Sequence, residues 1–100
     1  MSAVTNIILK TGLNEHKGIA ELNAKFFQSK PFISCDDDSL GHGWYAGSKC
    51  LECEIYVGAF NHLVISDLVS AIRTVNWDDR PGVQLFAQGP EGHWMKEIEL

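Results

Sequence analysis

The chain has 100 residues, of which 45% are apolar and 21% are charged, and its formal net charge is −5. This length predicts one domain over residues 1–100 with a single core, and the composition excludes a disordered chain. The negative charge and the scattered basic residues argue against a nucleic-acid partner, because phosphate binding requires clustered Lys and Arg.

Neither a membrane span nor a disulfide framework is expected. The longest apolar runs, such as residues 63–65, cover only a few positions, whereas a spanning helix needs about 20. No basic cluster precedes an apolar stretch in the first residues, so no secretory signal is predicted. Three cysteines are an odd number, which favours reduced thiols. We expect a cytoplasmic protein without a cofactor.

The first half of the chain predicts a strand, a helix, a short strand and a loop. Residues 4–10 are β-branched and apolar, which is typical of a strand. Asn14 is the expected N-cap of a helix that ends before Pro31, because the residue before a proline is disfavoured in the α region. Residues 31–35 predict a short strand, and the turn-rich residues 36–49 predict a loop.

The second half predicts a long strand, a second helix and two more strands. Residues 50–60 alternate as a strand does, and Ser66 is the expected N-cap of an amphipathic helix that ends near 76–77. Residues 83–88 and 93–100 predict the last two strands, separated by a four-residue turn.

The predicted order is therefore β-α-β(β)-α-β-β, which indicates the α+β class. Two amphipathic helices among strands with one apolar face favour a two-layer sandwich, with both helices on one side of a mainly antiparallel sheet. A ferredoxin-like sheet with one extra strand is the expected architecture. The order of the strands within the sheet cannot be predicted from one sequence.

Alternation along residues 50–60 divides that strand into two rows. The row with Leu51, Cys53, Ile55, Val57 and Ala59 is expected to face the helices, and the row with Glu52, Glu54, Tyr56 and Phe60 to face away from them. In the next strand Val83, Leu85 and Ala87 are expected inward, with Gln84, Phe86 and Gln88 outward. In the last strand Trp94, Ile98 and Leu100 are expected inward, with His93, Met95, Glu97 and Glu99 outward.

These rows predict an interaction surface on the open face, the side of the sheet turned away from the helices. Its expected residues are Tyr56, Phe60, Phe86 and Met95, with Glu52 and Glu54 in an acidic rim. An apolar centre within a polar rim is typical of protein interfaces. The expected function is therefore a non-catalytic module that binds a second copy of itself or a more basic protein, as an inhibitor or immunity protein does. Alternatively, residues 36–49, with Trp44 and Tyr45, cover this face within the monomer.

A metal or catalytic site is the competing hypothesis. Cys50 and Cys53, with Cys35 and His42, have the composition of a zinc site, but residues three apart in a strand point to opposite faces. The acidic run Asp36–Asp38 lacks the later ligands of a calcium loop, so a solvated turn is favoured and no metal is expected. The alternative function is a small enzyme or ligand-binding domain with its site near Asp36–Tyr45 and His42 as an acid–base group or metal ligand.

Overall fold

The computed structural model describes residues 3–25, 32–35 and 52–100, and within them it has an α+β fold. Its elements in chain order are β1 (Val4–Thr11), α1 (His16–Lys25), β2 (Ile33–Ser34), β3 (Glu54–Asn61), α2 (Ile65–Thr74), a short 3-10 helix η2 (Arg80–Gly82), β4 (Gln84–Gln88) and β5 (Lys96–Ile98). The predicted class, with two helices and an antiparallel sheet, is confirmed. Within these residues, neither helix is long and apolar enough to span a bilayer.

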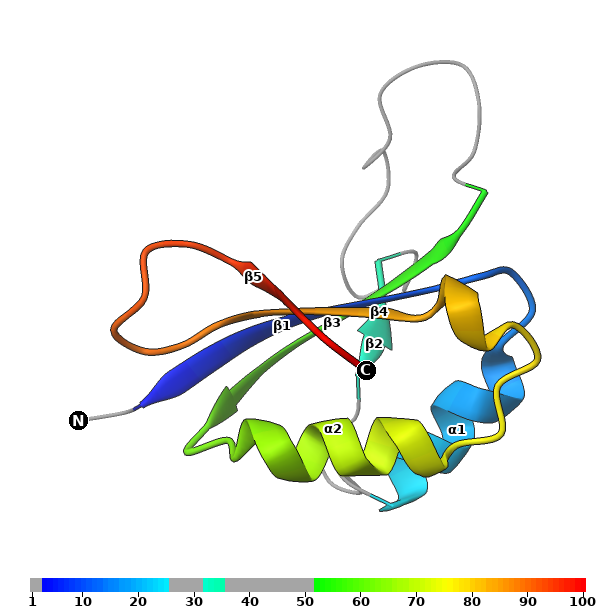
Figure 1. Ribbon diagram of the computed structural model, residues 1–100, viewed down its shortest axis with the longest axis horizontal. Coiled ribbons are helices and arrows are strands. Elements are labelled where there is room, and N and C mark those ends of the chain that lie inside the picture. Colours follow the sequence, from blue (N-terminus) through cyan, green and yellow to red (C-terminus); the bar gives the residue numbers. More distant parts are fainter. Residues whose placement is uncertain (1–2, 26–31, 36–51) are drawn as a thin grey trace.

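The five strands form one sheet in the order β2-β3-β1-β4-β5, and each adjacent pair is antiparallel. β1 lies at the centre, where it pairs along its whole length with β3 and along most of it with β4. Both helices lie on the same side of this sheet (Figure 1). The sheet therefore has a helix-covered face and the open face.

The helix-covered face holds the core. One row of paired residues crosses the sheet and continues through Ser34, Tyr56, Leu9, Leu85 and Ile98. The buried apolar residues are Ile7, Leu9, Ile19, Leu22, Phe32, Tyr56, Phe60, Leu68, Ile72, Val75, Trp77, Val83, Leu85 and Ala87. The predicted inward row of β4 is confirmed, since Val83, Leu85 and Ala87 all belong to this set.

The predicted orientation of the two side-chain rows of β3 was wrong. Tyr56 and Phe60 are 5% and 6% exposed and belong to the core, whereas Val57 is half-buried and Ala59 is exposed. The Phe60 ring packs over Gly58, where a Cβ would collide with it, and it meets the Phe32 ring edge-on at 5.2 Å. Because two large aromatic side chains bury more apolar area than valine and alanine, their row turns toward the helices.

The last strand is shorter than predicted. β5 contains three residues, and only Ile98 of the predicted inward set packs against the core. Trp94 is 78% exposed and Leu100 is 37% exposed, so both were placed wrongly. Both residues lie outside the paired segment, and strand alternation does not fix the direction of side chains there.

The expected helix caps also differ from the observed ones. α2 begins at Ile65, and its N-cap is Val64, which makes no side-chain capping bond. Asn14 lies two residues before the start of α1 in a left-handed conformation with φ of 65°. The buried Glu15 instead holds the approach to α1, because its carboxylate accepts hydrogen bonds from the backbone N–H groups of Asp78 and Asp79, both at 3.0 Å.

Candidate functional site

An apolar row crosses the open face at the middle of the sheet. Cross-strand pairing places Ile33 beside Val57, Val57 beside Ile8, and Ile8 beside Phe86, with Glu97 at the end of the row. All four apolar side chains are half-buried. Neighbours in such a row contact one another directly and stabilise the sheet, so these side chains form a continuous apolar strip on four strands.

A shallow hollow of about 510 Å³ is lined by three members of this strip, Ile8, Ile33 and Val57, but not by Phe86. Its lining includes Ile8, Ile33, Val57, Ala59 and Met95. Met95 is 37% exposed and extends the apolar surface beyond the paired strands. The hollow therefore adds concavity to the strip, and contiguous apolar surface of this kind marks interaction sites more often than scattered apolar residues do.

The charges on this face are few. In the paired strand positions that the structure describes, Lys10 and Glu97 are the charged residues of the open face. The Lys10 ammonium donates to the Gly82 carbonyl at 3.0 Å, and Glu97 accepts from the Gln84 amide at 3.0 Å. The described strand positions of this face are thus close to neutral, although the whole chain carries −5.

The predicted acidic rim of Glu52 and Glu54 is not found at the paired strand positions of the open face. Glu54 lies in the same row as Tyr56, on the helix-covered side, and its Oε2 accepts the Tyr56 hydroxyl hydrogen bond at 2.5 Å. Glu52 is exposed and precedes β3. Of the predicted interface residues, Phe86 and Met95 lie on the open face, while Tyr56, Phe60 and Glu54 do not.

Sequence reasoning missed the residues that form the centre of the strip, Ile8, Ile33 and Val57. A signal for Ile8 was present, because Ile7, Ile8 and Leu9 are three consecutive apolar residues. Since consecutive side chains of a strand point to opposite faces, such a run predicts apolar surface on both sides of the sheet.

A polar cluster lies where β3 begins. His16 Nε2 is 3.7 Å from Glu54 Oε1, and the other oxygen of Glu54 accepts the Tyr56 hydroxyl. Burial, followed by the hydrogen bond to Glu54, raises the pKa of the Tyr56 phenol well above its ordinary value of 10.0. A phenol in this state keeps its proton at neutral pH, so Tyr56 acts here as a fixed donor and is unsuited to serve as a general base.

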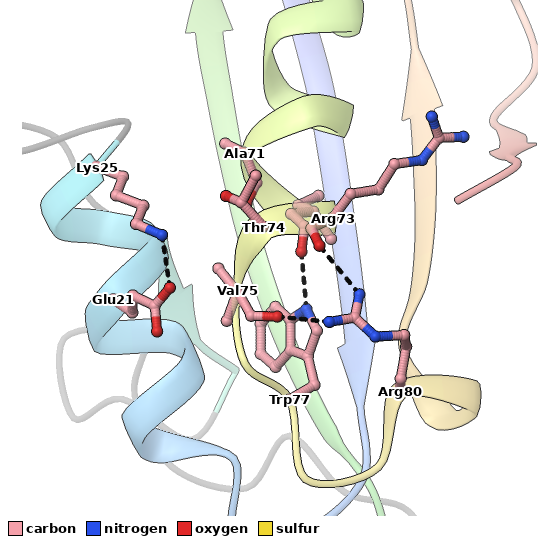
Figure 2. A network of polar contacts seen from close by, with 9 residues as sticks. Glu21, Lys25, Ala71, Arg73, Thr74, Val75, Trp77 and Arg80 are labelled. Atoms are coloured by element: carbon pink, nitrogen blue, oxygen red, sulfur yellow. Dashed lines mark hydrogen bonds and ion pairs between the residues drawn. The ribbon is translucent and has the colours of Figure 1, made fainter.

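A second polar network closes the C-terminal end of α2 (Figure 2). The Arg80 guanidinium donates to the carbonyls of Arg73 at 3.2 Å and Val75 at 2.7 Å, and the Trp77 indole N–H donates to the Ile72 carbonyl at 2.9 Å. These carbonyls belong to the last turn of the helix and the residue after it, where backbone acceptors lack helical partners. The network therefore has a structural role.

Metal binding gains no support from the residues that can be placed. Among residues 3–25, 32–35 and 52–100, no group of three or more His, Cys, Asp or Glu side chains is arranged to hold a metal ion. The Asp36–Asp38 run, His42, Tyr45 and Cys50 lie outside the described residues, as does the rest of the predicted loop. The alternative site near Asp36–Tyr45 stays a prediction.

The apolar strip and the hollow over it are thus the main candidate for a binding surface. No protein-family model matches the chain, and no curated protein or solved structure is significantly similar to it.

Proposed function

We propose that this chain is a non-catalytic interaction module that binds a second copy of itself through the open face of its sheet. The observation that carries the proposal is the apolar row formed by Ile33, Val57, Ile8 and Phe86, which runs across four adjacent strands. The exposed parts of these half-buried apolar side chains leave water when a partner covers them, which is favourable.

The chemistry of the face favours a second copy over a basic partner. A strongly basic protein would gain by meeting clustered carboxylates, but Lys10 and Glu97 balance each other on the paired strands of this face. Two near-neutral faces can approach without the repulsion that a net charge of −5 would otherwise cause. Two sheet faces with interdigitating side chains pack at about 10 Å separation, as in β-sandwiches.

The strand order supports a proposal about architecture as well. In the run β2-β3-β1-β4, one helix connects β1 to β2 and the other connects β3 to β4. This is the order of a ferredoxin-like two-layer sandwich, and β5 would add one strand at its edge. Such a sandwich leaves one sheet face without helices, which is the face that the proposed dimer would bury. A cytoplasmic location stays part of the proposal.

The test is the mass of the protein in solution over a range of concentrations, measured by light scattering after size exclusion. We expect twice the 11.1 kDa of one chain. Val57→Lys places an ammonium group in the middle of the strip and should shift the protein to the monomer. Met95→Lys, which changes an exposed residue outside the strands, should weaken the dimer without disturbing the sheet.

Ser70→Lys is the matched control, because it adds the same charge at an exposed position of α2 on the opposite side of the sheet. It should leave the dimer intact, and circular dichroism should show the same fold for all variants. A wild-type protein that is monomeric at every concentration, or a Met95→Lys dimer that dissociates over the same concentration range as the wild type, would overturn the proposal.

A further inference from the structure

A second concavity lies between the end of α2 and β5, and it shares only Gln84 and Glu97 with the open face. It has a volume of about 750 Å³, within the range of small-ligand sites. Its lining comes from α2, η2, the start of β4, β5 and the residues after β5. Ile72 of α2 and Val83 before β4, which line it, are buried in the core.

The floor of this cavity is apolar. Ile72, Trp77, Val83 and Ile98 line it, and all four belong to the core or pack against it. The Trp77 ring is held in place by the hydrogen bond from its indole N–H to the Ile72 carbonyl. The floor is therefore rigid and suits an aliphatic or aromatic side chain.

The rim carries both signs of charge. Two of the four charged side chains are already engaged, since Arg80 donates to backbone carbonyls and Glu97 accepts from Gln84. Arg73 and Glu99 are exposed, and in the described part of the chain neither side chain has a hydrogen bond or ion pair. Figure 2 shows the Arg73 side chain extending away from the Arg80 guanidinium.

We infer that this cavity binds an apolar α-amino acid, either free or as a short peptide. The ligand carboxylate would meet the Arg73 guanidinium, the ammonium group would meet the Glu99 carboxylate, and the side chain would lie on the floor. A simple anion fits less well because of Glu99 and Glu97, and a simple cation fits less well because of Arg73 and Arg80. A zwitterion with an apolar side chain satisfies both unpaired charges and the floor.

Calorimetric titration with phenylalanine, leucine and the dipeptide phenylalanyl-leucine tests this inference. Tighter binding of a single amino acid indicates a free ligand, and tighter binding of the dipeptide indicates a peptide. We expect saturable binding in the millimolar range or below. Phenylalanine amide lacks the carboxylate and N-acetylphenylalanine lacks the ammonium group, so each should bind about tenfold more weakly than phenylalanine.

Two variants then assign the contacts. In Arg73→Gln, phenylalanine and its amide should bind equally weakly. N-acetylphenylalanine should still bind more weakly than phenylalanine. In Glu99→Gln, phenylalanine and N-acetylphenylalanine should bind equally weakly, while phenylalanine amide should still bind more weakly than phenylalanine. Arg73→Gln leaves the backbone carbonyl that Arg80 uses, so the fold is expected to survive.

Lys17→Gln, an equal charge change on the exposed surface of α1, is the control and should bind as the wild type does. The inference is overturned if no zwitterionic probe saturates, if the blocked compounds bind as well as phenylalanine, or if Arg73→Gln keeps the wild-type preference for the carboxylate. These results are independent of the mass measurements that test the dimer.

Discussion

Gly18 of α1 lies directly against the indole ring of Trp77. A Cβ atom at position 18 would be 2.5 Å from both Cε3 and Cζ3 of that ring, which is closer than any ordinary van der Waals contact. Trp77 cannot easily move away, because its N–H is bonded to the Ile72 carbonyl. The glycine thus sets the distance between α1 and the segment that follows α2.

Gly18→Ala should lower the free energy of unfolding by about 1–2 kcal/mol in urea denaturation. An alanine inside an isolated helix would stabilise it by about 0.5–1 kcal/mol, so the sign of the change separates packing from helix propensity. Gly89→Ala is the control, since a Cβ there meets nothing within 4 Å and stability should hardly change. A more stable Gly18→Ala protein would contradict the contact.

Glu15→Gln should cost about 1–3 kcal/mol of stability in the same measurement. Both Glu15 oxygens accept backbone N–H groups, of Asp78 and Asp79, and the side chain is buried. A glutamine turns an NH₂ group toward one of these donors and leaves that N–H without an acceptor. Glu21→Gln removes a carboxylate from an exposed pair with Lys25 and should change stability little. Equal effects of the two substitutions would show that the bonds of Glu15 do not hold the loop.

The stability of the protein should decrease as the pH rises above 10.0, the ordinary pKa of tyrosine, and Tyr56 should cause part of that decrease. The pKa of Tyr56 is raised in the folded state, so above pH 10.0 the unfolded chain releases a proton that the folded chain retains. Proton release on unfolding favours the unfolded state, and the contribution is fully present below pH 10.0.

Tyr56→Phe should therefore flatten the alkaline part of the stability curve relative to the wild type. Thermal unfolding followed by circular dichroism between neutral pH and alkaline pH gives the comparison. Because Tyr56 also donates to Glu54, the variant should be somewhat less stable at neutral pH. Parallel curves for the two proteins would mean that Tyr56 ionises equally in both states.

Sequence reasoning predicted the elements whose patterns are one-sided. In α2, Leu68 and Ile72 lie on one stripe and both are buried, and the alternation of β4 gave the correct inward row. For such elements only one orientation buries the apolar side chains, so periodicity is sufficient.

The orientation of β3 was predicted wrongly because both faces of this strand are apolar. Ile55 and Val57 compete with Tyr56 and Phe60, and alternation alone gives no reason to prefer one row. The choice depends on tertiary contacts, namely the Phe32 ring beside Phe60 and the pairing of Tyr56 with Leu9. The same ambiguity concealed the strip on the open face, because its members come from strands whose neighbours in the sheet were unknown.

The central place of β1 has a consequence for how the chain acquires its structure during synthesis. β1 is made before the other strands, but Val4 pairs with Asn61 and Asn6 pairs with Gln88, so both of its partners are made much later. Contacts between such distant residues carry a large loop-closure entropy, and topologies of this kind fold more slowly than helical ones. We expect the nascent chain to stay without a sheet until β3 has emerged, and the two-sided apolar strand β1 to be the segment that a chaperone would shield.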